Sequence, residues 1–272
     1  MRLLGHSHFT LSIVAIFGYT SNISPKVGTV LSFSITAYYI IIGNCVGYGT
    51  FDKENNQKII FGIQFNGIGS ETGLLFKDLK GDFVDGDNIQ MSYCENGKTK
   101  LMDYYYLTMD DSYVDEDGWY NKDTDFIGDT EYIPWGKGAW FVAYDEAKSL
   151  TMSGEVKKGH KIHTFTDPKT LVTSFYPTPF CPNSANVTWS NQTDSDNIQV
   201  QGNKDGKTIL IDYYYLTMDD SYVDEDGWYD KDTELLGPND SIVGVGEGFW
   251  FIPVNVETSF TEVSPLGDEE AK

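Results

Sequence analysis

The chain alternates short apolar runs with clusters of glycine, proline, asparagine and aspartate, and no long segment carries apolar residues at helical spacing. Runs of this kind, rich in β-branched and aromatic residues, are typical of strands joined by tight turns. The predicted strands include residues 58–65, 138–144, 149–156, 161–165, 170–176, 186–190 and 248–254. The pattern therefore predicts an all-β protein made of two tandem antiparallel β-sandwich or barrel-like modules.

Two β-hairpins are predicted from a pair of similar segments. Asn96-Gly97 lies between "NIQMSY" and "KTKLMDYYYLTM", and Asp205-Gly206 lies between "NIQVQG" and "KTILIDYYYLTM". Both dipeptides suit a type I′ turn, which needs a positive φ at both central residues. The exchange of Asn for Asp keeps this property, so each segment is expected to form a hairpin.

These hairpins belong to an internal repeat. The stretch "DYYYLTMDDSYVDEDGWY" occurs twice, and 22 of 24 positions agree between residues 101–124 and 210–233. Weaker similarity extends to "GDNIQ" and "SDNIQ" upstream and to "GKGAWF" and "GEGFWF" downstream. A period of about 100 residues is typical of tandem domains, since the units of solenoids are shorter. A recent duplication and a functional constraint explain this sequence identity equally well.

The repeat and the composition divide the chain into four parts. We expect an apolar leader at 1–45, a first β module at 46–152, a second β module at 153–264 and an acidic tail at 265–272.

The leader has the composition of an export signal. The first 51 residues carry only two charged side chains, Arg2 and Lys26, and both are basic. A basic residue followed by the uncharged run 27–43 matches a secretory signal peptide, with cleavage between residues 42 and 45. A retained membrane anchor and buried strands are the alternatives. The leader therefore predicts a secreted or cell-surface protein.

The formal net charge of −22 restricts the partners of the mature part. Repulsion argues against nucleic acid and anionic membrane surfaces. The charge either keeps an exported β protein soluble or serves a specific role in cation binding. The cysteines are too few for a disulfide framework, although Cys94 and Cys181 could form one bridge in an oxidising compartment.

An acidic loop follows the tyrosine-rich strand in each copy. Calcium prefers about six to eight oxygen ligands, which alternating aspartates beside a glycine can supply. The EF-hand register fails, because it places Tyr113 and Thr124 where carboxylates are required. A calcium site of another kind would use Asp111, Asp115 and Asp117 in one copy and Asp220, Asp224 and Asp226 in the other. The alternative is a solvated, charged loop without a metal.

Aromatic residues near the loops suggest a second class of ligand. Rows of tyrosine and tryptophan rings can stack on sugar rings, or they can fill a sheet core and keep their polar tips in water. The candidate carbohydrate-binding residues are Tyr105, Trp119, Tyr120, Tyr214, Trp228 and Tyr229.

Catalytic motifs are missing from the sequence. It contains no G-x-S-x-G, no H-E-x-x-H and no cysteine–histidine setting, and His160 and His163 have no counterpart in the second copy. Glycine-rich "GIGSETG" and "VGVGEG" lack the lysine and the strand–helix context of a phosphate loop. Pairs of carboxylates could serve glycoside hydrolysis, but acidic residues are so numerous that such pairs arise by chance. We therefore expect no enzymatic activity.

Several motifs resemble those of exported bacterial proteins built from tandem β-rich modules. The motifs are "VGYGTF", "GIQF", "DNIQ", "DGWY", "GKGAWF", "GEGFWF" and "SGEV". The resemblance covers most of residues 46–262. It implies export and an all-β fold, and it brings no activity or catalytic residues to this chain.

Together these features predict a secreted or cell-surface structural or adhesive β-repeat protein without catalysis. It would self-associate or bind a surface polymer or glycan, and calcium is the one cofactor considered. The first alternative is a module that binds calcium or carbohydrate through the paired loops. The second alternative is a glycoside hydrolase.

Overall fold

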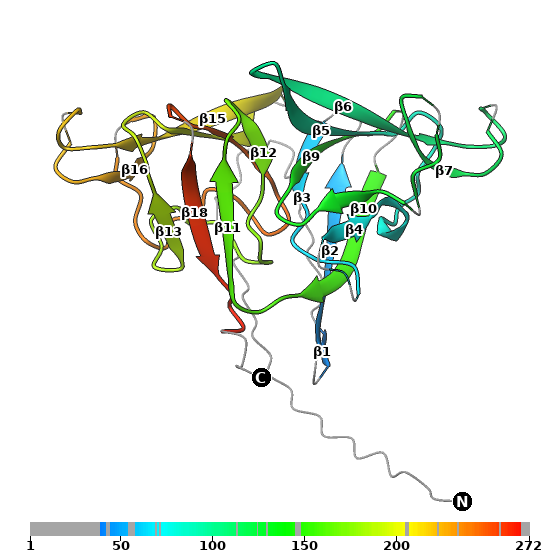
Figure 1. Cartoon of the computed structure of the whole chain (residues 1–272), viewed down its shortest axis with the longest axis horizontal. Coiled ribbons are helices and arrows are strands. Elements are labelled where there is room, and N and C mark those ends of the chain that lie inside the picture. Colours follow the sequence, from blue (N-terminus) through cyan, green and yellow to red (C-terminus); the bar gives the residue numbers. More distant parts are fainter. Residues whose placement is uncertain are drawn as a thin grey trace, which may run out of the picture. The chain divides into compact units, whose positions relative to one another are not determined.

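The computed structural model describes strands and loops over most of the chain (Figure 1). The described residues are 39–41, 44–53 and 58–267, except positions 69, 71, 113, 124, 129, 145–147, 205–206, 222, 233 and 256. All of them belong to one structural unit, Phe33–Lys272. Residues 1–38 of the expected leader and 268–272 of the expected acidic tail lie outside the described residues. The signal peptide therefore stays a prediction.

Two five-stranded antiparallel sheets contain most of the repeat. The first has the order β3 (Lys58–Gly62), β9 (Gly138–Val142), β5 (Asn88–Glu95), β6 (Lys98–Leu107) and β7 (Gly118–Asn121). The second has the order β12 (Thr170–Val172), β17 (Phe249–Ile252), β14 (Asn197–Lys204), β15 (Lys207–Leu216) and β16 (Gly227–Tyr229). The two orders correspond strand for strand, and the pairing registers correspond as well: Gln90 lies opposite Asp103, and Gln199 lies opposite Asp212.

Smaller antiparallel sheets accompany them in the described part of the chain. One contains β1 (Tyr39–Ile41), β2 (Asn44–Lys53) and β10 (Lys148–Val156), and another contains β11 (His160–Phe165), β18 (Thr258–Val263) and β13 (Val187–Ser190). A third pairs β4 (Gly73–Leu75) with β8 (Tyr132–Pro134), and a 3-10 turn, η1, covers Phe76–Asp78. Figure 1 shows β11 and β18 side by side, as their hydrogen-bond pairing requires.

The first hairpin forms as its turn residues predict. β5 and β6 pair along their whole length, and Asn96 and Gly97 between them have φ values of 53° and 70°. Positive φ at both positions is the signature of a type I′ turn, so this prediction is confirmed. β14 and β15 also pair along their whole length, while positions 205–206 lie outside the described residues. Turn chemistry therefore sets the register of the strands that lead to the acidic loops.

Each five-stranded sheet packs one face on a hydrophobic core that a smaller sheet covers. In the first core, Ile89 and Phe141 of the large sheet meet Met152 of β10. In the second core, Phe251 of the large sheet and Phe260 of β18 both pack against Phe165 of β11, and these side chains are buried like those of the first core. Two sheets that face each other across an apolar core form a β-sandwich. The all-β fold class is confirmed, and the described strands form open sheets rather than a closed barrel.

The expected boundary between the modules falls inside a strand. β10 crosses position 152/153 and pairs with β2 along its length. Phe175 and Tyr176 follow the boundary in sequence but pack in the first core. The two halves are therefore joined by shared packing as well as by the chain. Below, the first half denotes residues 46–152 and the second half denotes residues 153–264.

Cys94, on β5, and Cys181 are free cysteines in the structure. The one disulfide bridge that the sequence left open is therefore not formed. Burial raises the pKa of the Cys181 thiol, and the nearby Asp240 carboxylate raises it further. Because the thiolate is the reactive form, these surroundings reduce the reactivity of Cys181.

Candidate functional site: the twin acidic loops

Two acidic loops connect strands at the same place in the two large sheets. Acidic loop 1 comprises residues 108–117, between β6 and β7, and acidic loop 2 comprises residues 217–226, between β15 and β16. The flanking strands pair directly, so that Leu107 lies opposite Gly118 and the equivalent pair closes the second loop. Each loop therefore starts and ends at neighbouring points of its sheet.

An aspartate outside each loop holds the first turn of the loop. Asp85 Oδ1 accepts hydrogen bonds from Thr108 N at 3.0 Å and from Ser112 Oγ at 2.6 Å. Asp194 accepts the two equivalent hydrogen bonds in the second half at 2.9 and 2.7 Å. Burial raises the pKa of Asp194, but the hydrogen bonds that the carboxylate accepts outweigh burial and hold the pKa below its ordinary value. Hydrogen bonds to an ionised acceptor are about twice as strong as neutral ones, which stabilises the loop conformation.

Sequence reasoning did not single out Asp85 and Asp194 as loop residues. A signal was present, because each stands two positions before the aspartate of the "DNIQ" strand, in "DGDNIQ" and "DSDNIQ". The second aspartate has a different role. Asp87 is fully buried and accepts hydrogen bonds from Val84 N at 2.9 Å and Tyr144 N at 2.8 Å. The D-x-D spacing therefore supplies one acceptor to the acidic loop and one to the backbone around the sheet.

The end of each loop is closed by an aspartate that the sequence predicted as a calcium ligand. Asp117 Oδ1 accepts a hydrogen bond from Met109 N at 2.7 Å, and Asp226 accepts the equivalent hydrogen bond at 2.8 Å. The Tyr120 hydroxyl donates to Glu116 O at 2.7 Å, and its counterpart in the second half does so at 2.6 Å. The same contacts therefore restrain both loops at both ends.

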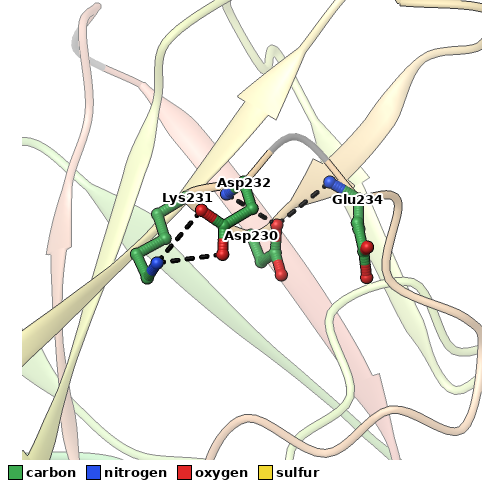
Figure 2. A network of polar contacts seen from close by, with 4 residues as sticks. All are labelled: Asp230, Lys231, Asp232 and Glu234. Atoms are coloured by element: carbon green, nitrogen blue, oxygen red, sulfur yellow. Dashed lines mark hydrogen bonds and ion pairs between the residues drawn. The ribbon is translucent and has the colours of Figure 1, made fainter.

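The turn after each loop is also held by one side-chain oxygen. Figure 2 shows Asp230, whose Oδ1 accepts hydrogen bonds from Asp232 N at 2.8 Å and Glu234 N at 3.0 Å, while Lys231 contacts the Asp232 carboxylate. In the first half, Asn121 Oδ1 accepts the two equivalent hydrogen bonds, both at 2.9 Å. This position is one of the two that differ within the repeat, and the exchange keeps the oxygen that an Asx turn needs.

The six predicted calcium ligands are exposed. They are Asp111, Asp115, Asp117, Asp220, Asp224 and Asp226. Within the described residues, no group of three or more His, Cys, Asp or Glu side chains is arranged to hold a metal ion. Asp117 and Asp226 contact the backbone of their own loops instead. Calcium binding therefore stays a prediction.

The acidic side chains shift the pKa of the tyrosine beside each loop in the same direction. Burial raises the pKa of Tyr120, the hydrogen bond to the Glu116 carbonyl opposes that shift, and the charges of Glu116, Asp115 and Asp117 add to it. The same kinds of group raise the pKa of Tyr229 in the second half. The carboxylates of both loops therefore disfavour ionisation of the adjacent tyrosine.

The candidate carbohydrate-binding residues fall into a buried set and an exposed set. The buried residues are Trp119, Tyr120, Trp228 and Tyr229. Tyr105 and Tyr214 are exposed by 37% and 36%. Because Tyr104 packs in the first core, the alternation of β6 places Tyr105 on the opposite, outer face of the sheet. The structure thus brings the two exposed rings to equivalent outer faces and the other four into the interior.

Polar side chains share these outer faces with the exposed tyrosines. Gln90 Nε2 donates to Asp103 Oδ1 at 2.6 Å, and Gln199 Nε2 donates to Asp212 Oδ1 at 2.8 Å. Lys169 Nζ donates to Gln199 Oε1 at 2.7 Å. Amide and carboxylate groups in fixed orientations beside an aromatic ring can bind a ligand that is rich in hydroxyl groups.

No protein-family model, curated protein or solved structure matches this chain. Within the described ranges, no helix has the length and apolar character that a membrane crossing requires. Function is therefore inferred from the loops and the sheet faces themselves.

Proposed function

We propose that this chain is a secreted or cell-surface structural or adhesive protein without catalytic activity, and that the two acidic loops are its attachment sites. The observation that carries the proposal is the equivalence of the loops. Asp85 and Asp117 hold acidic loop 1, and Asp194 and Asp226 hold acidic loop 2 through the same partners.

Loops that are already restrained by hydrogen bonds favour binding, because they lose little conformational freedom when a partner binds. Two equivalent loops on one chain can contact a repetitive surface together, and the second contact then forms at a high effective concentration. The net charge of −22 favours a partner with positive groups and disfavours nucleic acid and anionic membranes. A surface polymer that carries positive groups would meet these conditions.

The equivalence of the halves supports an origin by internal duplication of one β module. The strand orders of the two large sheets correspond, and the loops agree in sequence and in hydrogen bonding. Duplication of an attachment module adds a second contact point without requiring a new fold. This is the advantage expected for an adhesive protein that acts outside the cell.

The proposal is tested with the full chain on immobilised polylysine, which serves as a cationic probe. One variant replaces the aspartates of loop 1 that make no loop-closing contact, Asp110, Asp111 and Asp115, by asparagine. A second variant replaces their equivalents in loop 2, Asp219, Asp220 and Asp224. Loss of bivalent contact predicts a fall in apparent affinity of about 100-fold or more for either variant, measured by biolayer interferometry.

A matched control separates the loops from net charge. It neutralises three exposed acids outside the loops, Asp82, Glu131 and Glu234, and should bind nearly as well as the unmodified chain. If this control loses as much affinity as the loop variants, charge alone explains binding and the attachment role is wrong. The role is equally wrong if one intact loop binds as tightly as two.

Carbohydrate binding is a second candidate function, and the exposed tyrosines favour it. Tyr105 and Tyr214 lie on outer faces that also carry hydrogen-bonded glutamine–aspartate pairs. A soluble glycan panel should then change the tryptophan fluorescence of the chain. The double variant Tyr105→Ala/Tyr214→Ala should abolish that change, and a panel without any response would eliminate this candidate.

A further inference from the structure

The two halves meet where an edge strand of each half approaches the sheet of the other. Gly62 N, at the end of β3, donates to Gly246 O at 2.7 Å. Thr173 N, directly after β12, donates to Gly136 O at 3.0 Å. Each acceptor is the first glycine of a G-x-G motif, "GEG" or "GKG". The backbone contact between the halves is therefore reciprocal.

The pairing registers show that the reciprocal partners are equivalent positions. Ile60 and Leu171 each lie opposite the tryptophan of the G-x-G-x-W strand in their own half. Gly62 lies two residues after Ile60, and Thr173 lies two residues after Leu171, so Gly62 and Thr173 are equivalent positions. The halves are thus related by a pseudo-two-fold axis, and the same contact between identical chains would be an isologous interface.

Side chains repeat this reciprocity on either side of the axis. Gln201 Oε1 accepts a hydrogen bond from Ile60 N at 2.7 Å, and Ser92 Oγ accepts one from Leu171 N at 3.0 Å. Gln201 and Ser92 occupy equivalent positions of β14 and β5. Ile60, Leu171 and the two tryptophans opposite them form one apolar cluster between the halves.

At the centre of the interface the symmetry is broken. Gly62 and Thr173 lie side by side, and a β-carbon added to Gly62 would be 2.1 Å from Thr173 Oγ1. Gly62 does not have a positive φ, so glycine is required there by space rather than by backbone conformation. Thr173 is fully buried. Its side chain fills the room that the absent β-carbon of Gly62 leaves.

A second unsymmetrical residue depends on the same threonine. Gln64 Nε2 donates to Thr173 Oγ1 at 3.4 Å, and Gln64 Oε1 accepts from Gly246 N at 2.7 Å. The Thr173 hydroxyl donates in turn to Glu247 O at 2.6 Å. The residue equivalent to Gln64 in the second half is Phe175, which has no polar side-chain atom. This buried network therefore needs Gln64 from a first half and Thr173 from a second half.

We propose that Gly62 and Thr173 form a matched pair that makes the first half specific for the second half of the chain and excludes the pairing of like halves. Two first halves would place two glycines at the axis, which leaves a gap and removes the hydroxyl partner of Gln64. Two second halves would place two threonines in the space of one. Both arrangements cost free energy that the unlike pair avoids, so each chain closes on itself at this interface.

A double-mutant cycle in the full chain recreates every combination. Gly62→Thr places two threonines at the axis, as two second halves would, and Thr173→Gly places two glycines there, as two first halves would. The double variant Gly62→Thr/Thr173→Gly restores an unlike pair with the roles exchanged. Each single substitution should raise the equilibrium constant for unfolding about tenfold or more in a urea titration. The double variant should unfold less readily than either single variant.

Matched controls distinguish pairing from general effects of glycine and threonine in strands. Gly202 lies on β14, and a β-carbon there would meet the flexible end of the Ile211 side chain within the same sheet. Gly202→Thr combined with Thr173→Gly has the composition of the swapped variant and should show no recovery. If Gly62→Thr does not fold, Gly62→Ser with and without Thr173→Gly makes the same comparison. If the effects of the two substitutions on the unfolding free energy add, the residues do not act as a pair and the proposal is wrong.

Discussion

Glu262 should make the stability of the protein fall as the pH rises. Its side chain lies on the central strand β18 with an exposed fraction of 4%, and Oε2 accepts a hydrogen bond from Phe175 N at 2.5 Å. Burial raises the pKa of the carboxyl group from 4.5 to about 7, although hydrogen bonds from Phe175 and Ser174 oppose the shift. Phe175 belongs to the segment that packs in the first core, so ionisation of Glu262 affects a contact between the halves.

The sign follows from proton binding in the two states. Between pH 4.5 and about 7 the folded state holds a proton at Glu262 that the unfolded state has lost. The contribution of Glu262 to stability is therefore greatest below pH 4.5 and decreases as the pH rises through this window. The difference between a pKa of 4.5 and one of about 7 corresponds to about 3 kcal/mol, since a tenfold change in proton affinity is worth about 1.4 kcal/mol. Glu262→Gln keeps the shape and the acceptor oxygen but cannot ionise, so it should remove this loss.

The assay compares urea unfolding of the unmodified chain and Glu262→Gln, followed by tryptophan fluorescence. At about pH 5 the two unfolding free energies should be similar, and at about pH 8 the variant should be more stable by about 3 kcal/mol. Glu116→Gln, at an exposed position, is the control and should show no such trend. A difference between the chain and Glu262→Gln that stays constant with pH would refute the reasoning.

Three further outcomes are expected. Asp230→Asn should leave the unfolding free energy unchanged, because Asn121 holds the equivalent turn, whereas Asp230→Ala should cost about 1–2 kcal/mol in the same titration. Asp194→Ala should speed hydrogen exchange in acidic loop 2 and leave acidic loop 1 protected, which mass spectrometry can resolve. If the predicted calcium site exists, millimolar calcium should raise Tm and EDTA should lower it, and a Tm that responds to neither would exclude it.

Local chemistry was sufficient for the hairpins and for the fold class, but β7, β16 and β18 were not among the predicted strands. Asn96-Gly97 predicts a type I′ turn because both residues tolerate positive φ, and that turn forms. The position occupied by Asn121 and Asp230 shows the same principle, because either residue supplies the oxygen that the turn requires.

The candidate site was only partly predictable. The acidic loops were located from the sequence, but the contacts of their side chains were not. Asp117 was predicted as a calcium ligand, and in the structure its carboxylate accepts a hydrogen bond from Met109 N. Trp119 was a candidate for sugar binding with a core role as the alternative, and its ring is buried in the first core. Composition indicates which groups a loop contains, but the contacts of a side chain depend on the path of the backbone around it.

The sequence by itself determined the hairpins, the repeat and the sign of the net charge. The repeat and the charge are read directly from the residues, and the hairpins follow from interactions between residues close together in the chain. Only the tertiary structure decided how the two halves meet. Gly62 and Thr173 are far apart in sequence, and no local preference of either residue indicates that one fills the space left by the other. Their contact depends on the register of two separate sheets at once. A pairing of this kind is specified by the packing of the whole fold. At this contact the two copies of the repeat differ, because one supplies the glycine and the other supplies the threonine.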